Sequence, residues 1–354
     1  RCYGRCSAGH PLARRSVPAP VGDYRGCVTA AVTVLMPVFN GEAFVRQSIE
    51  SILRQTWTDF ELVIVDDGST DATPRILASF RDPRTRVITS PRREGIACAL
   101  NRGLASASAP LVARQDADDV SHPARLEKQL AFLEANRSIV VLGTQIRVID
   151  ERGRVSHPPG WRRPLTHAGI RFVSMFDNPF IHGSVVFRRE VVGPYDATLE
   201  SAEDFDLWSR VAAHHPVANL PEALVDHRVH SESMAAAFGD AHAALVRVII
   251  ERNVRDVLGV ANVTDFESLW RHYPERKSAD VRRAAAVKFG DIALSLATCH
   301  RTAALNAFGH AVRCDSRTAS AFLSRFVPLL LFGESARGMK RWLTTASRAS
   351  RRSR

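Results

Sequence analysis

The sequence feature that most constrains the fold is a fourfold alternation of strand-like and helix-like segments between residues 31 and 135. The run Val32 to Met36 is apolar and β-branched on both faces, as in a strand buried between two layers. A polar turn follows, and Val45, Ile49 and Ile52 then recur at helical spacing. Because this unit is repeated, the sequence predicts an α/β fold with a largely parallel sheet, whose ligands bind at the carboxyl ends of the strands.

The same patterns predict the other elements. Further strands are expected at residues 62–65, 85–90 and 110–115, and further helices from about 71, over 94–108 and after 125. The next part of the chain is expected to hold a strand pair within 138–150, a loop-bearing insertion over 152–178, a strand at 183–189, a helix at 203–215 and one or two short strands within 216–230.

Three parts of the chain differ in composition. Residues 1–30 are rich in Arg, Gly, Pro and Ser and are expected to form a poorly ordered extension. Residues 31–231 carry the α/β pattern, and residues 232–354 are expected to form a helical region with a basic tail. Residues 317–354 contain eight Arg and one Lys against a single acid, so this segment is either drawn to phosphates or is a solvated tail.

Composition narrows the class of protein. The 45% of hydrophobic and 24% of charged residues are ordinary for a soluble globular chain. The net charge of +11 is less ordinary, because it is a marked basic excess. The six cysteines form no framework, which fits a reducing, cytoplasmic location. The apolar run at 326–332 is far shorter than the ~18–20 residues of a membrane span, so any membrane contact is expected to be peripheral, on the inner face.

Three carboxylates stand within four positions directly after the predicted fourth strand, at Asp116, Asp118 and Asp119. Like charges this close need a cation or hydrogen-bond donors in order to stay ionised away from water. Alone, one D-x-D is often only turn chemistry. Here polar loops also follow the other three strands, so all four loops are expected at one sheet edge, where they suit Mg²⁺ or Mn²⁺ and a phosphorylated ligand.

Four stretches carry a resemblance to a known family. They are "VTVLMPVFNGEAFVRQSIESILRQTWTDFELVIVDDGSTDAT", "GIACALNRGL", "ARQDADDVSHPARLEKQ" and "AEDFDLWSRVA". Together they resemble the inverting family 2 glycosyltransferases of the GT-A fold, over roughly residues 31–231. The resemblance implies a Rossmann-like mixed, mostly parallel sheet flanked by helices. It further implies transfer of a sugar from a nucleotide diphosphate sugar, UDP or dTDP favoured, to a glycan or lipid-linked acceptor, in cell-surface polysaccharide synthesis.

The resemblance also implies roles for individual residues. Asp204 is the catalytic base, Glu203 its orienting neighbour and Asp206 a structural competitor. The metal ligands are Asp118 and Asp116, with Asp119 as an alternative because D-A-D-D fits a three-residue motif in two ways. His230 is either a metal or phosphate ligand or an ordinary surface residue. The residues expected to bind substrate are Pro37, Val38, Phe39, Glu42, Asp67, Asn101, Asp116, His182 and Glu203.

Several features leave alternatives open. Arg92 and Arg93 either meet phosphate or form a solvated turn, and Trp161 is a candidate for stacking on a sugar, whereas Trp208 fits the core better. The C-terminal helices either dock on a membrane or pack on the catalytic domain. The rival functions are nucleotidyl transfer and a non-catalytic basic module that binds membranes or nucleic acid. No nucleic-acid partner is expected, because the Arg-rich charge is terminal and not interleaved with aromatics.

Overall fold

The computed structural model describes residues 30–157, 163–230 and 239–258, together with 279, 281–283, 285–287, 311 and 313–320. The predicted N-terminal extension therefore lies outside the described residues, except for its last position. Trp161 and the predicted domain boundary near 232 also lie outside them. Among the helices that are described, none has both the length and the apolar character needed to span a membrane.

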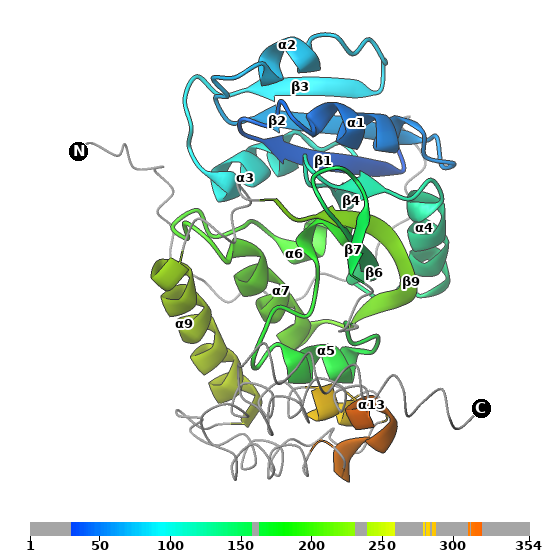
Figure 1. Ribbon diagram of the computed structural model, residues 1–354, viewed down its shortest axis with the longest axis vertical. Coiled ribbons are helices and arrows are strands. Elements are labelled where there is room, and N and C mark those ends of the chain that lie inside the picture. Colours follow the sequence, from blue (N-terminus) through cyan, green and yellow to red (C-terminus); the bar gives the residue numbers. More distant parts are fainter. Residues whose placement is uncertain are drawn as a thin grey trace, which may run out of the picture.

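The first half of the chain confirms the predicted alternation (Figure 1). Four parallel strands lie in the order β3-β2-β1-β4. These strands are β1 (Val32–Val38), β2 (Phe60–Asp66), β3 (Thr85–Thr89) and β4 (Leu111–Arg114). The connecting helices are α1 (Val45–Leu53), α2 (Thr73–Leu77) and α3 (Ile96–Ser106), and α4 (Arg125–Ala135) follows β4.

The second half makes the sheet mixed. Strand β8 runs antiparallel to both β4 and β6, β9 is parallel to β6, and β5 pairs antiparallel with β9. The strands are β5 (Val120–Ser121), β6 (Val141–Ile149), β7 (Val155–His157), β8 (Val186–Arg188) and β9 (Val217–Arg228). The helices are α5 (His167–Val173), the 3-10 turn η1 (His182–Ser184), α6 (Arg189–Val192), α7 (Glu203–His214), α9 (Gly239–Leu258) and α13 (Ser316–Ser320).

Both faces of the sheet are buried, as the uninterrupted apolar runs predicted. Val34 and Met36 of β1 face a cluster that includes Ile49 of α1 and Leu130 of α4. Leu35, between them, faces the opposite cluster, which includes residues of α3 and α7. Since successive strand residues point to opposite faces, each face of β1 needs its own apolar layer.

Two sequence expectations differ from the structure. Residues 138–150 form one strand, β6, and not the expected pair. The strand continues because its start pairs with β8, its length pairs with β9, and its end pairs with β7. Residues 152–178 are more regular than an insertion of loops, since they contain β7 and α5. Helix α5 escaped the sequence pattern because it has only seven residues, about two turns.

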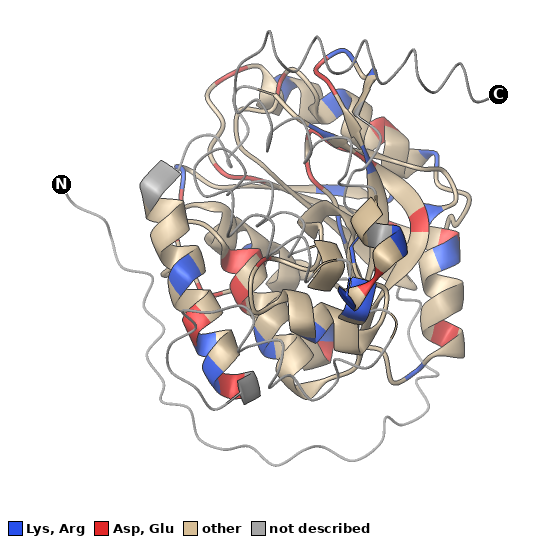
Figure 2. Ribbon diagram, turned by 60° about the horizontal axis from the view of Figure 1, so that its bottom comes forward, with Lys and Arg blue, Asp and Glu red and all other residues tan. Residues whose placement is uncertain are grey.

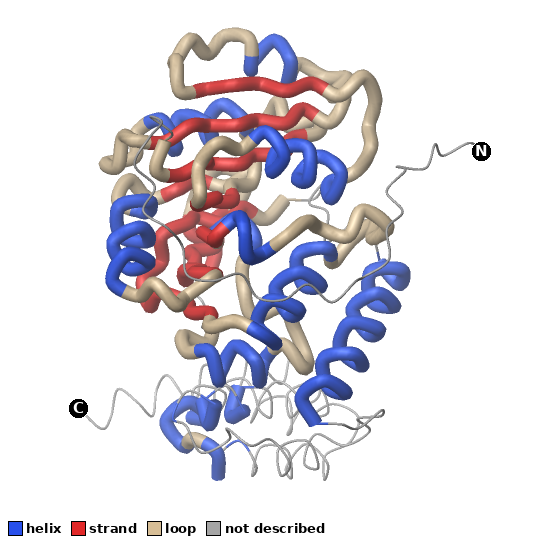
Figure 3. Tube along the Cα trace, turned by 180° about the vertical axis from the view of Figure 1, so that it is seen from behind, coloured by secondary structure: helices blue, strands red, loops and turns tan. Residues whose placement is uncertain are grey.

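Helices α5, α7 and α9 lie together at the end of the molecule away from β3 (Figures 1 and 3). Arg252 of α9 contacts both Asp206 and Ser209 of α7, and Asn253 Nδ2 donates to Ser174 O at 2.7 Å. Phe172 of α5, Val254 of α9 and described residues from 281 to 319 form one apolar cluster. The described part of the C-terminal region therefore packs on the α/β part of the chain, and acidic and basic positions are mixed along α9 (Figure 2).

Candidate active site

The polar loops predicted at one edge of the sheet do meet there. The strand order turns back at β1, which has β2 on one side and β4 on the other. The carboxyl ends of strands at such a turning point are where α/β sheets bind ligands. The segment after β1 and the acidic loop after β4 are neighbours here, because Ser48 Oγ of α1 donates to Asp116 O at 2.7 Å.

The loop after β1 is tied to the loop after β2 by paired hydrogen bonds. Asn40 N donates to Ser69 Oγ at 2.9 Å, and Thr70 N donates back to Asn40 Oδ1 at 2.9 Å. Glu42 N donates to Asp71 Oδ2 at 3.0 Å, and the Glu42 carboxylate accepts from Ala72 N at 2.7 Å. Of the predicted pocket residues, Pro37 and Val38 are buried at the end of β1, whereas Phe39 and Glu42 are exposed.

Asp67 is held by the loop that precedes α3. Its two carboxylate oxygens accept from Glu94 N at 2.9 Å and from Gly95 N at 2.8 Å. Burial raises its pKa, and these two donors oppose the rise. Gly68 comes next, with a φ of +75° and no room for a Cβ against the backbone of Arg92. The Arg93 guanidinium stacks on Phe39 at 4.4 Å from the ring centroid, which brings a cation to this edge.

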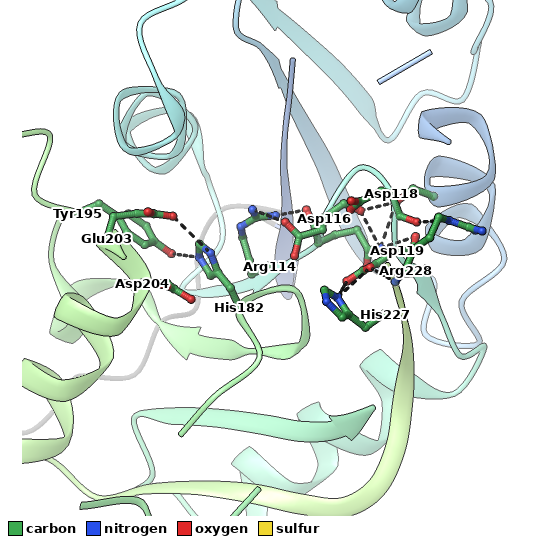
Figure 4. Close-up of polar contacts among 12 residues, drawn as sticks. Arg114, Asp116, Asp118, Asp119, His182, Tyr195, Glu203, Asp204, His227 and Arg228 are labelled. Atoms are coloured by element: carbon green, nitrogen blue, oxygen red, sulfur yellow. Dashed lines mark hydrogen bonds and ion pairs between the residues drawn. The ribbon is translucent and has the colours of Figure 1, made fainter. Parts of the chain in front are cut away.

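The acidic loop after β4 is neutralised mainly by buried cations. We call Asp116, Asp118, Asp119, His227, Arg228 and His230 the strand-edge cluster. Figure 4 labels all of these except His230. Arg114 is almost fully buried, and its Nη2 donates to Asp116 Oδ1 at 2.8 Å. Burial alone would raise the pKa of Asp116, but the charge and hydrogen bond of Arg114 together with the nearby histidines outweigh burial, so the pKa is lowered.

Asp119 differs from its neighbours because it is fully buried. One of its oxygens accepts from Arg228 N at 2.8 Å, and the other lies 3.2 Å from His227 Nδ1. Burial raises the pKa of Asp119 to about 6. Burial works against the charged form of His227, but the bond to Asp119 raises its pKa to about 9. Near neutral pH the two side chains therefore form an ion pair whose Asp119 end is buried and whose His227 end is partly exposed.

Asp118 is the member of the acidic loop that remains partly exposed with a histidine beside it. His230 Nε2 lies 3.0 Å from Asp118 Oδ2. No group of three or more His, Cys, Asp or Glu side chains that could hold a metal occurs in the described part of the chain. A carboxylate and an imidazole side by side are nevertheless groups that can bind a divalent ion when water and phosphate supply its other ligands.

Arg228 holds the strand-edge cluster to the rest of the fold. Its guanidinium donates to Asp118 O at 2.9 Å, to the carbonyls of Asp150 and Glu151 at 3.0 and 3.1 Å, and to Gln47 Oε1 at 2.7 Å. It also lies over the ring of Phe44, at 4.6 Å from the centroid. Sequence reasoning missed Arg228, His227 and Arg114. For Arg114 the available signal was an ionisable residue at the end of an otherwise apolar strand.

A second group of ionisable side chains lies across Arg114 from the first. We call His182, Tyr195, Glu203 and Asp204 the helix-end cluster, because Glu203 and Asp204 begin α7 (Figure 4). His182 Nε2 lies 2.9 Å from Tyr195 Oη, and burial lowers the pKa of His182 well below its ordinary value. Burial and the neighbouring Asp204 raise the pKa of Glu203 to about 8. This cluster is therefore largely uncharged at neutral pH, unlike the strand-edge cluster.

Asp204 is only partly buried and carries two hydrogen bonds. Its Oδ1 accepts from Phe205 N at 2.7 Å, and its Oδ2 accepts from Asn178 Nδ2 at 2.7 Å. Burial raises its pKa, while these two donors oppose the rise. Glycine is required between the clusters, since a Cβ on Gly183 would lie 2.5 Å from Asp116 Oδ2 and 2.9 Å from Asp119 Oδ2.

The other predicted residues have structural partners. Asn101 is engaged by the main chain of Tyr195, to which its amide both donates and accepts at 2.9 Å. Trp208 is fully buried, as expected for a core residue. Asp206 points away from Asp204, toward Arg210 and Arg252, which fits the structural role considered for it.

Known proteins resemble this chain in sequence. The model of glycosyl transferase family 2 matches residues 33–194. The putative glycosyltransferase EpsE of Bacillus subtilis is 37% identical over 212 residues, which are 57% of this chain and 74% of that protein. The O-antigen biosynthesis glycosyltransferase WbnJ of Escherichia coli is 30% identical over 254 residues, which are 68% of this chain and 94% of that protein.

A solved structure shares the fold. The crystal structure of residues 1–349 of S. aureus TarS in complex with UDP-GlcNAc superposes with a TM-score of 0.54 at 18% identity, covering 91% of this chain and 92% of that one. The fold is thus of the GT-A type that the sequence resemblance implied. With the family match and relatives at 30% identity or more, the chain belongs to glycosyltransferase family 2.

Proposed function

We propose that this protein is an inverting, metal-dependent glycosyltransferase that moves a sugar from a UDP or dTDP sugar to a hydroxyl of a glycan or lipid-linked acceptor. The observation that carries the proposal is that acidic side chains lie on both sides of Arg114. A partly exposed carboxylate with an adjacent histidine stands on one side, and the partly exposed Asp204 stands on the other (Figure 4). Inversion requires a nucleotide leaving on one face of the sugar and a base on the opposite face.

Related proteins support the class of donor and acceptor. TarS has been solved with UDP and with UDP-GlcNAc, which favours a uridine nucleotide here. WbnJ acts in O-antigen biosynthesis and AmsE of Erwinia amylovora, 34% identical over 208 residues, in amylovoran biosynthesis. These names favour a role in cell-surface polysaccharide synthesis. Membership in a glycosyltransferase family weighs against nucleotidyl transfer and against a purely non-catalytic module.

For the metal, we propose that Asp118 and His230 bind Mg²⁺ or Mn²⁺. Asp119 is less suited, because both of its oxygens already accept from Arg228 and His227 inside the protein. Asp116 is paired with Arg114, so it fits better as a contact to the donor than as the main ligand. When bound, such an ion would supply Lewis-acid stabilisation to the charge that develops on the diphosphate.

The proposed base is Asp204. Glu203, with a pKa of about 8, keeps a proton near neutral pH, so the two adjacent carboxyl groups do not carry charge together. Asp204 then accepts the proton of the attacking acceptor hydroxyl. His182, held neutral by burial, offers a polar contact without adding charge. We propose that it lies near the sugar or the acceptor.

The test is release of nucleoside diphosphate from a panel of nucleotide sugars with Mn²⁺ and glycan or lipid acceptors. UDP-GlcNAc is the first donor to try. Asp204→Asn should retain donor binding and lose transfer by about two to four orders of magnitude. Asp206→Asn, on the same helix but turned toward Arg252, is the matched control. Silence with every donor would contradict the proposal, and a loss of donor affinity in Asp204→Asn would reassign that residue.

Membrane contact is a separate part of the proposal. The described helices of the C-terminal region pack on α5 and α9, and only residues 317–320 of the basic tail are described. We propose that the remaining tail brings the enzyme to the inner membrane surface, where a lipid-linked acceptor would be found. Co-sedimentation with anionic liposomes should fall when residues 321–354 are deleted, and equal sedimentation would rule out anchoring by this tail.

A further inference from the structure

The carboxylate proposed as the base receives a side-chain hydrogen bond from outside its own helix. Asn178, in the loop between α5 and η1, donates through Nδ2 to Asp204 Oδ2 at 2.7 Å. The other oxygen of Asp204 accepts from Phe205 N. Donors on two different oxygens fix the plane of a carboxylate and leave each oxygen a further lone pair.

The orientation of the Asn178 amide is set by a second contact. Its Oδ1 accepts from Phe180 N at 3.1 Å, which leaves the NH₂ group to face Asp204. The backbone beside it is also held, because Arg163 Nη1 donates to Asn178 O at 2.5 Å. Phe180 is buried and packs edge-on against Trp208 of α7, so the loop and the helix are joined through the core as well.

We propose that Asn178 is a positioning residue, whose amide fixes the rotamer of Asp204 and so aims a lone pair at the acceptor hydroxyl. This inference rests on the proposed function, because it takes Asp204 as the base. Functional carboxylates hold a productive geometry only when a supporting side chain is itself locked in place, and Asn178 meets that condition.

The surroundings of Asp204 are mixed in charge. An amide donor in this setting favours the ionised carboxylate without adding a charge. Removal of Asn178 should therefore free the rotamer and also make the carboxylate easier to protonate. The charged and titratable groups whose interactions involve Asp204 are Arg114, Asp116, Arg163, Tyr195 and Glu203.

A titration that needs no substrate tests this directly. The protein is labelled with carboxyl-¹³C aspartate and titrated by NMR. The signal of Asp204 is identified as the one that is absent in the Asp204→Asn variant. In Asn178→Ala the pKa of Asp204 should rise by on the order of one unit. In Asn178→Asp, which keeps the acceptor for Phe180 N but adds a like charge, the rise should be larger.

The matched control loosens the same loop without touching the base. Asn219 Nδ2 donates to Pro164 O at 2.7 Å and to Pro179 O at 3.2 Å. Asn219→Ala should lower the melting temperature and leave the pKa of Asp204 where it is in the parent. An unchanged pKa in Asn178→Ala, or an equal shift in Asn219→Ala, would overturn the proposal.

Turnover separates this inference from the proposed function. With the donor found in the panel, Asn178→Ala should lose about tenfold to a hundredfold in kcat and keep the KM for the donor. If Asp204→Asn still transfers sugar, the base assignment fails, whatever the titration shows. If Asp204→Asn is inactive and the Asn178 variants titrate like the parent, the positioning role alone fails.

Discussion

The two halves of the proposed active site treat buried carboxylates in opposite ways. In the strand-edge cluster, Arg114 and His227 supply positive charge, so the carboxylates beside them can stay ionised. In the helix-end cluster, burial and like charge raise the pKa of Glu203 and Asp204, and Glu203 takes up a proton. The first arrangement suits binding of a cation with a diphosphate, and the second suits proton transfer near neutral pH.

The largest effect should come from removing the Arg228 side chain from the strand-edge cluster. We expect Arg228→Met to cost about 2–4 kcal/mol in the free energy of unfolding, because the carbonyls of Asp118, Asp150 and Glu151 lose their buried donor. Urea denaturation measures this, and nucleotide titration should show weaker donor binding. A loss below ~1 kcal/mol would mean that the cluster does not depend on this cation.

Gly183 lies where the two halves meet, so the next prediction concerns their junction. Gly183→Ala places a Cβ against the carboxylates of Asp116 and Asp119, and η1 must shift. We expect a cost of about 1–3 kcal/mol and more than tenfold loss of transfer. In an Asp116→Ala background the same substitution should cost less in unfolding free energy. Strict additivity of the two changes would show that they do not touch.

The helix-end cluster predicts that the free energy of unfolding depends on pH. The pKa of Glu203 is about 8 in the fold against an ordinary value of 4.5. Between these values the folded chain holds a proton that the unfolded chain releases, so the unfolding free energy of the parent falls as pH rises. Glu203→Gln lacks this effect and should gain stability relative to the parent across that window, by at most ~1.4 kcal/mol per pH unit.

Urea midpoints at about pH 5 and about pH 8 measure the Glu203 effect. The matched control is Glu222→Gln on β9, an exposed carboxylate paired with Lys128, which should follow the parent at both values. Parallel curves for Glu203→Gln and the parent would mean that Glu203 is ionised throughout, and the contrast between the two halves would then be lost.

The smallest effect should come from an arginine close to Arg228 that lies at the surface. Arg147 of β6 forms a two-point ion pair with Asp226 of β9, at 2.6 Å for each contact, and its side chain is 54% exposed. We expect Arg147→Gln to change the unfolding free energy by only ~0–1 kcal/mol. A cost equal to that of Arg228→Met would show that burial is not the deciding difference.

Local sequence predicted the elements that repeat a strong pattern and misjudged those that depend on distant partners. The strands at Val32 and Leu62 and the helix after the first of them are apolar on a clear period, and the structure confirms them. The short α5 and the length of β6 depend on α7 and β9 as partners, which lie far along the chain. Short-range patterns carry no information about such contacts.

The site shows the same division. The sequence alone determined that several acidic side chains follow strands, because strand ends and turns are local properties. It left Asp118 and Asp119 equivalent, since both stand in the same loop. Only the tertiary structure distinguished them, by burying Asp119 against His227 and Arg228, more than a hundred residues away, and leaving Asp118 partly exposed beside His230. Burial and partner charge, which decide whether a carboxylate is a structural ion pair or an open ligand, exist only once the strands are assembled.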